Sequence, residues 1–352
     1  MNQIRVAQWA TGTTGRLALR AIIDSPGLDL AGVRVYDPAK TGRDAGTLVD
    51  RPPTGVLATD VSADVRRAAP DVVLYMGAVE KYPDECFADV AELLAAGIDV
   101  IATGSSFIDV HAFDPGRGAA IAAACQQGRS SFLGVGLFPG FWGEAVVPVL
   151  SRLSARCGRI TVRESLSYAD YPSRDMLVDV MGYGQSPEST AALLSNPDRA
   201  RGAFIATASV LAKALGLKVA AVEAFRETAV TGTELHVAAG PIPAGTVAAM
   251  KLGVRADCGP VEIVVEHITW LAAEVVPDWS TREGYEVEFD GAPTLRCHLM
   301  LGTNGEAHTE MGCLATAMHA VHAIPVVTAA LPGVMDLADT APFTGGYAWP
   351  PS

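Results

Sequence analysis

A short glycine-containing stretch near the N-terminus has the residue types and the spacing to bind phosphate. The stretch consists of Thr11, Gly12, Thr13, Thr14 and Gly15. Glycines at this spacing let the backbone approach a pyrophosphate, and the free N–H groups at the start of a following helix attract its negative charge. The first glycine of the usual G-x-G-x-x-G motif is absent, because Trp9 or Ala10 occupies its place. An ordinary turn between a strand and a helix therefore stays open as the alternative.

A second stretch of small polar residues is suited to contact a substrate. Thr103, Gly104, Ser105 and Ser106 follow the apolar run 100–102, and their small side chains would let a flat ring lie against the backbone. Ser105 or Ser106 is predicted to hydrogen-bond the oxygen or nitrogen of the substrate. A serine cannot act as a base at neutral pH unless a partner activates it.

The residues after the apolar run 28–35 would determine whether the protein prefers NAD or NADP. Asp37 lies where a carboxylate would bind the adenosine ribose hydroxyls and repel a 2′-phosphate. Asp37 is equally suited to be a simple turn former, and Lys40 and Arg43 could serve a 2′-phosphate instead. The expected cofactor is therefore NAD or NADP, with NAD slightly favoured.

These polar stretches all follow apolar runs that alternate with helical patterns through residues 1–145. Gly77 follows the run 72–76, and Phe138 follows the run 132–137. Strands without polar alternation, joined by helices, predict a parallel sheet that is covered on both faces. Ligands of such sheets bind at the carboxyl ends of the strands. Residues 1–145 are therefore predicted to form a doubly wound α/β domain of the Rossmann type that binds NAD(P).

The pattern changes near Cys157, where apolar and polar residues alternate. The predicted strands with one buried face are residues 159–168, 219–230, 247–254, 261–268 and 285–301. They predict a second α+β domain, residues 146–310, with a mostly antiparallel or mixed sheet. A last helix over 314–324 is expected to stop at Pro325, and the segment 311–352 is expected to return to the cleft beside the first domain.

Composition excludes several classes of protein. A chain of 352 residues with 49% hydrophobic and 18% charged residues is typical of a globular protein of two domains. Its formal net charge of −13 argues against nucleic acid and against an anionic membrane surface as partners. No apolar run reaches the ~18–20 residues that cross a bilayer, and the N-terminus leads directly into a predicted strand, without room for a signal peptide. Six scattered cysteines without a C-x-x-C pair favour a reduced, cytoplasmic protein.

Two other chemistries find little support. His319 and His322 are spaced to share one helix face, but a metal site needs further ligands at matched spacing, so no metal is expected. A Ser–His–Asp triad is not supported either, because no G-x-S-x-G elbow is present.

The chain as a whole resembles a known family. It is similar to mycobacterial and related proteins with a dihydrodipicolinate-reductase-like N-terminal domain, in the group of 2,4-diaminopentanoate dehydrogenase and the native amine dehydrogenases. The matching segments are QWATGTTGR (8–16), GRDAG (42–46), FPGF (138–141), DVMGYG (179–184), GTVAA (245–249), EHI (266–268) and ATAMHAVHAIP (315–325). The resemblance implies an NAD(P)-binding domain, a sheet-containing domain for substrate contacts and dimerisation, and hydride transfer to a carbonyl or imine carbon.

One departure from this family concerns catalysis. Native amine dehydrogenases carry a glutamate just after the fifth strand, which is credited with handling ammonia and protons. The matching stretch here, residues 103–107, has no carboxylate. The departure puts ammonia-dependent amination in doubt, whereas hydride transfer to C=O or C=N survives. Glu80, Asp109 and Glu144 are nearby candidates to replace the missing group.

The favoured function is an NAD(P)-dependent oxidoreductase for a small-molecule substrate, a hydrophobic ketone or imine or the matching alcohol or amine. Phe138, Trp142, Tyr168, Met181 and His322 are expected in the substrate pocket. Core packing is the alternative for Trp142 and Met181, and Tyr168 could be an ordinary sheet residue. The alternative function is a catalytically impaired protein that senses the cofactor or a metabolite. A homodimer through the second domain's sheet is expected, because one face of its alternating strands needs cover.

Overall fold

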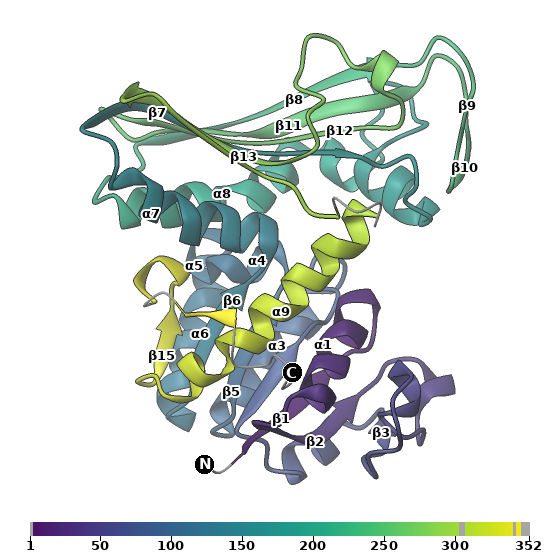
Figure 1. The fold of residues 1–352 in the computed structure, drawn as a ribbon, viewed down its shortest axis with the longest axis vertical. Helices are drawn as coiled ribbons and strands as arrows, with labels where there is room; N and C mark the ends of the chain where they lie inside the picture. Colours follow the sequence, from purple (N-terminus) through teal and green to yellow (C-terminus); the bar gives the residue numbers. More distant parts are fainter. Residues whose placement is uncertain (1–2, 303–306, 341–342, 346–352) are drawn as a thin grey trace. The chain divides into compact units, whose positions relative to one another are not determined.

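The computed structural model describes residues 3–302, 307–340 and 343–345, which form two compact units (Figure 1). Unit 1 contains residues 1–141 and 310–352, and unit 2 contains residues 142–309. The chain therefore leaves unit 1 after Phe141 and returns to it at Glu310. Unit 1 is built from two segments that lie far apart in the sequence.

Unit 1 contains a parallel sheet in the strand order β15-β6-β5-β4-β1-β2-β3. Its strands are β1 (Ile4–Trp9), β2 (Leu28–Arg34), β3 (Ala58–Thr59), β4 (Val72–Tyr75), β5 (Asp99–Thr103), β6 (Ser131–Val135) and β15 (Gly333–Met335). Every residue of β4 and β6 is buried, as expected for strands that are covered on both faces. The predicted doubly wound α/β fold is confirmed. The edge strand β15 was not predicted from the tail.

Helices cover both faces of this sheet (Figure 1). The helices are α1 (Thr13–Asp24), α2 (Ser62–Arg67), α3 (Pro83–Ala95), α4 (Ser105–Ile108), α5 (Val110–Phe113), α6 (Pro115–Gly128) and α9 (His308–Thr328). Alternate strand residues pack on opposite sides: Val73 and Val100 contact the layer of α3 and α6, whereas Leu74 and Ile101 contact the layer of α1 and α9. Short helical turns are η1 (Pro38–Lys40), η2 (Thr47–Val49) and η7 (Leu337–Asp339).

The last helix, α9, differs from its prediction in two ways. It continues through Pro325 to Thr328, and the Thr328 hydroxyl donates to the Ile324 carbonyl at 2.9 Å. Among the described residues, α9 is also the one helix long and apolar enough to cross a membrane by length and composition. That finding corrects the sequence-based expectation of no such segment. Its residues 317, 320, 321, 323, 324 and 327 are buried in the core of unit 1, which is the reason for the apolar composition.

Unit 2 contains a mixed sheet in the order β14-β13-β7-β12-β11-β8. Its strands are β7 (Arg156–Ser167), β8 (Ala221–Val230), β11 (Val247–Asp257), β12 (Glu262–Trp270), β13 (Gly284–Ala292) and β14 (Leu295–Leu299), and β9 (Leu235–Val237) pairs separately with β10 (Gly240–Ile242). The pair β7–β12 is parallel and the other neighbours are antiparallel. The predicted single strand over 285–301 is wrong, because Pro293 and Thr294 separate two strands of a hairpin.

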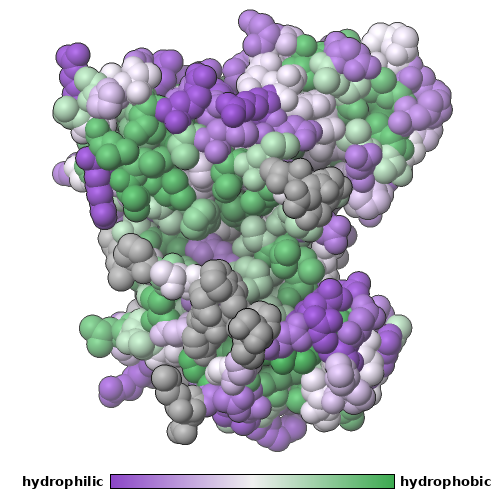
Figure 2. All heavy atoms as spheres, viewed as in Figure 1, coloured by the Kyte–Doolittle hydropathy of each residue, from purple (hydrophilic) through white to green (hydrophobic). Residues whose placement is uncertain are grey.

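One face of this sheet is covered by helix, and the other is covered only in part, where residues after β12 pack on Ile268 and Trp270. Helix α8 (Pro197–Ala214) packs on β8, β11 and β12. The remaining helical segments are α7 (Val147–Ser151), the π-helical η3 (Leu137–Val146) and η4 (Met176–Met181), and the turns η5 (Leu193–Ser195) and η6 (Ala273–Val275). Figure 2 shows hydrophilic side chains along the side of the sheet that faces away from α7 and α8. The alternation of the strands thus separates a buried face from a polar one.

Candidate active site

The glycine turn between β1 and α1 combines a tightly packed glycine with an open one. Ala10 occupies the place of the missing first glycine, with φ at 72°, in the left-handed region that favours glycine. A Cβ on Gly15 would lie 2.2 Å from the Ala10 carbonyl oxygen, whereas a Cβ on Gly12 would have nothing within 4 Å. Gly15 therefore serves the packing of the turn, and the surface above Gly12 is open.

The first turn of α1 is free to receive an anion. Gly12 is its N-cap, without a side-chain cap, and no acidic residue lies in the first turn. The N–H groups that a capping side chain would satisfy therefore remain available, together with the partial positive charge of the helix start. The residues present fit the phosphates of a dinucleotide, with Thr11, Thr13 and Thr14 beside them.

The residues after β2 meet the same turn. The Lys40 ammonium donates to the Thr11 carbonyl at 3.0 Å and lies 3.3 Å from the Thr11 hydroxyl oxygen. The Asp37 carboxylate accepts from the backbone N–H of Ala39 at 2.9 Å, which makes it the cap of η1. Asp37 and Lys40 thus both border the edge where an adenosine ribose would lie. The turn-forming role of Asp37 is observed directly.

The ends of β4 and β5 supply a second group of polar residues. A Cβ on Gly77 would lie 2.8 Å from the Tyr75 ring, and a Cβ on Gly104, whose φ is 128°, would lie 2.5 Å from Val79. Gly104 therefore lets the loop after β5 pack against Val79 in the loop after β4, and Gly77 leaves room for the ring of Tyr75. Thr103 and Ser106 are buried, and Ser105 is partly exposed. Ser105 contacts Glu80, a carboxylate that the sequence offered as one of three candidates and could not place.

Helix α9 borders the same edge of unit 1. Near its start, burial raises the pKa of the Cys313 thiol, and a hydrogen bond from the Thr14 side chain opposes that shift. One helical turn and a half further on, His319 Nδ1 lies 2.8 Å from the Gly136 carbonyl oxygen, at the end of β6. Since a carbonyl accepts, Nδ1 carries a proton, and burial lowers the pKa of His319. The helix thus spans from the glycine turn to the loop that contains Phe138.

His322 lies one turn further along α9. It is partly buried, and its Nδ1 has no hydrogen-bond partner among the described residues. Burial lowers the pKa of the imidazole, which favours the neutral form. A buried ring nitrogen without a partner is a place where a ligand group could bond. Within the described residues, no group of three or more His, Cys, Asp or Glu is arranged to hold a metal ion.

The other predicted pocket residues belong to unit 2. Trp142 and Met181 are buried, and Trp142 lies 6.4 Å from the Tyr285 ring. Tyr168 is partly exposed, with its ring 5.5 Å from that of Tyr171. Trp142, Tyr168 and Met181 belong to unit 2, whereas Phe138 and His322, the other two predicted pocket residues, belong to unit 1.

A carboxylate–imidazole pair in unit 2 was missed by the sequence analysis. His267 Nε2 lies 3.1 Å from Glu164 Oε2, and both side chains are nearly buried. The Tyr168 and Phe204 rings flank the imidazole at 6.2 and 6.1 Å. One feature of the sequence could have pointed to this pair. Glu164 lies on the same face of its strand as the buried residues Val162 and Leu166, where a charged side chain needs a partner.

Comparison with known proteins agrees with this geometry. Over 96% of its length, the chain is 31% identical to an amine dehydrogenase of Streptomyces virginiae, of which it covers 96%. The chain belongs to the amine dehydrogenase family. The model of the 2,4-diaminopentanoate dehydrogenase C-terminal domain matches residues 178–344. The resemblance found in the sequence is therefore confirmed.

Solved structures show the same fold at lower identity. The amine dehydrogenase of Mycobacterium smegmatis superposes with a TM-score of 0.78 at 17% identity, covering 97% of each chain. A biliverdin reductase of Synechocystis, in complex with biliverdin and NADP⁺, gives a TM-score of 0.53 at 12% identity, covering 98% of this chain and 95% of its own. As a member of the amine dehydrogenase family, the chain is an oxidoreductase of the NAD(P)-dependent dehydrogenase type.

Proposed function

We propose that this chain transfers hydride between NAD(P)H and a hydrophobic ketone or preformed imine, and that it aminates ketones with free ammonia less well. The observation that supports the proposal is the placement of Ser105, without a carboxylate in residues 103–107, at the β5 end of the same sheet that carries the open glycine turn. The bound cofactor supplies the hydride, and the protein supplies binding, orientation and polarisation.

In this proposal, unit 1 binds the cofactor and supplies hydrogen bonds to the substrate. The first turn of α1 holds the pyrophosphate, and the close packing around Gly77 and Gly104 leaves small side chains where a nicotinamide ring would lie. A serine hydroxyl polarises the reacting oxygen or nitrogen. The neutral His322, with its unpartnered Nδ1, offers a further hydrogen bond to substrate.

The expected result of a direct test is that the protein binds NADH or NADPH and forms more alcohol than amine from a ketone in ammonium buffer. The reason is that amination needs a group to deprotonate ammonia and to help water leave, and such acid–base help is typically worth ~10²–10⁴ in rate. The measurement is an anaerobic cofactor titration, followed by product analysis with and without ammonium. Amine as the main product would overturn the proposed preference. Cofactor binding without turnover of any ketone, imine, alcohol or amine would favour the sensing function.

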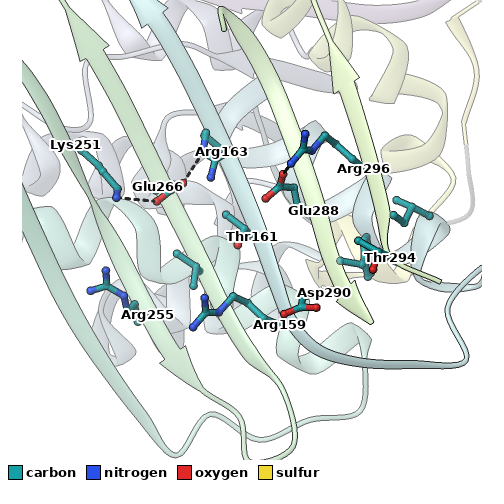
Figure 3. A pocket seen from close by; sticks show the side chains of 13 residues that line it. Arg159, Thr161, Arg163, Lys251, Arg255, Glu266, Glu288, Asp290, Thr294 and Arg296 are labelled. Atoms are coloured by element: carbon teal, nitrogen blue, oxygen red, sulfur yellow. Dashed lines mark hydrogen bonds and ion pairs between the residues drawn. The ribbon is translucent and has the colours of Figure 1, made fainter. Parts of the chain in front are cut away.

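We also infer that the protein forms a homodimer through the partly covered face of the sheet in unit 2. That face carries a groove of about 600 Å³, lined by β7, β11, β12 and the hairpin β13–β14 (Figure 3). Basic and acidic side chains alternate across it, including Arg159, Lys251, Glu266 and Asp290. A surface with both charges is suited to pair with a second copy of itself.

Sedimentation at micromolar concentration is expected to show a dimer. Arg255→Glu is expected to weaken the dimer at least ~10-fold, because a twofold axis places each charge change in the interface twice. Lys218→Glu is the matched control, with the same charge change at an exposed residue outside the groove. A monomer for the wild type, or equal behaviour of both variants, would contradict the interface.

The six free cysteines support a reduced, cytoplasmic location.

A further inference from the structure

The carboxylate of Glu80 reaches the first residue of α4 from a neighbouring loop. Its Oε1 accepts the backbone N–H of Ser105 at 2.8 Å and the Ser105 hydroxyl at 3.1 Å. Glu80 follows β4 and Ser105 follows β5, two strands that pair side by side in the parallel sheet. The register of this pairing brings the two loops together at the carboxyl edge of the sheet.

The local packing is arranged around this contact. A Cβ on Gly104 would lie 3.1 Å from Glu80 Oε1 and 2.5 Å from Val79, so a side chain there would displace the loop. Val79 is fully buried and fixes the residue beside Glu80, whereas Glu80 itself is exposed. The carboxylate therefore has a fixed contact with Ser105 on one side and bulk water on the other.

The other two carboxylates that the sequence offered, Asp109 and Glu144, have other partners. Asp109 accepts the N–H groups of His111 and Ala112 as the cap of α5. Glu144 is fully buried and accepts the hydroxyl of Thr207 at 2.6 Å. Ser106, the second predicted hydroxyl, is buried. Ser105 with Glu80 is therefore the pair with both an ionisable group and a path to water.

We propose that Glu80 and Ser105 form a relay that supplies the proton for ketone reduction, without taking over the handling of ammonia by the family glutamate; this inference rests on the proposed function. In this relay the Ser105 hydroxyl passes a proton from the Glu80 carboxyl to the substrate oxygen during reduction, and in the opposite direction during oxidation of the alcohol.

The proposed step balances in atoms and electrons. The carbonyl carbon accepts hydride, which carries two electrons, and the C=O π pair moves onto oxygen. That oxygen takes the proton of Ser105 Oγ, the Oγ takes the proton of Glu80, and water reprotonates the exposed carboxylate. The net change is one ketone, one hydride and one proton to one alcohol, with NAD(P)H oxidised to NAD(P)⁺.

Two substitutions at residue 80 separate proton transfer from positioning. Glu80→Gln keeps an oxygen that accepts both Ser105 groups but cannot deliver a proton, so we expect kcat for ketone reduction to fall ~10²-fold with KM and cofactor affinity unchanged. Glu80→Ala is expected to lose the same activity and to regain part of it with added formate. Glu85→Gln, an exposed glutamate of α3, is the matched control and is expected to keep full activity.

A measurement on the cofactor-free protein checks the contact itself. Glu80→Ala removes two hydrogen bonds to Ser105 and is expected to lower the melting temperature by about 2–4 °C, whereas Glu80→Gln leaves it unchanged. Wild-type kcat in Glu80→Gln would overturn the relay even though the proposed function stands. A wild type that binds cofactor and reduces no ketone or imine would overturn the proposed function and the relay together. Measuring wild-type activity therefore shows whether the relay alone has failed or the proposed function as well.

Discussion

Replacing Gly12 with valine is expected to raise the Kd for NADH and NADPH at least ~100-fold, a loss of about 2.7 kcal/mol. The branched side chain would lie where the backbone must approach the pyrophosphate. The fold should tolerate it, because a Cβ at Gly12 meets nothing within 4 Å and the residue is extended, with φ at −71° and ψ at −165°. Fluorescence titration of the cofactor, with thermal unfolding beside it, measures both effects.

Gly15→Ala is the informative comparison for this variant. Its Cβ would lie 2.2 Å from the Ala10 carbonyl oxygen, so the turn itself must shift and the melting temperature should fall. The two glycines therefore separate binding from folding: one variant loses cofactor at full stability, and the other loses stability first. Unchanged cofactor binding in Gly12→Val would show that the pyrophosphate is held elsewhere.

The second large effect is expected at Arg163 in unit 2. Its guanidinium pairs with Glu266 and Glu286, each at 2.5 Å, and the three side chains are 18%, 7% and 10% exposed (Figure 3 shows the Glu266 contact). Arg163→Met leaves two nearly buried carboxylates whose other cations, Lys251, Arg282 and Arg296, are 3.9 to 4.0 Å away. We expect the free energy of unfolding in urea to fall by about 3–5 kcal/mol.

Arg159→Met is the matched control, because Arg159 lies on the same strand and the same face. It is 57% exposed and pairs with Glu262, so its removal should cost about 0–1 kcal/mol. Adding Glu266→Gln and Glu286→Gln to Arg163→Met should recover most of the loss, since the uncompensated charges are then gone. Equal losses for Arg159→Met and Arg163→Met would show that burial of the carboxylates is not the cause.

The fold of unit 1 was largely predictable because its central strands are buried on both faces. Runs such as 72–75 and 132–135 then carry residues without polar side chains, which mark a parallel strand. Strand β15 has only three residues, Gly333–Met335, and forms by pairing with a strand that is distant in the sequence. No local pattern specifies such a strand, so the sequence did not predict it.

The site was predictable in its parts and not in its contacts. The glycine turn and the residues after β5 follow from the rule for strand ends. The bond between Glu80 and Ser105 depends on which strands are neighbours and on a close approach at Gly104, and these are properties of the folded sheet. The pair Glu164–His267 could not be predicted for the same reason. The two residues are about 100 positions apart, and only the pairing of β7 with β12 brings them opposite each other.

The division of unit 1 into two sequence segments has a consequence for synthesis on the ribosome. When the first 141 residues have emerged, Val6, Leu74, Ile101 and Leu133 still lack the cover of α9, whose Val321 and Ile324 complete their core. All of unit 2 must be translated before that helix appears. Until then, part of one face of the N-terminal sheet has no cover other than α1, and unit 2 is the first part of this protein able to finish folding.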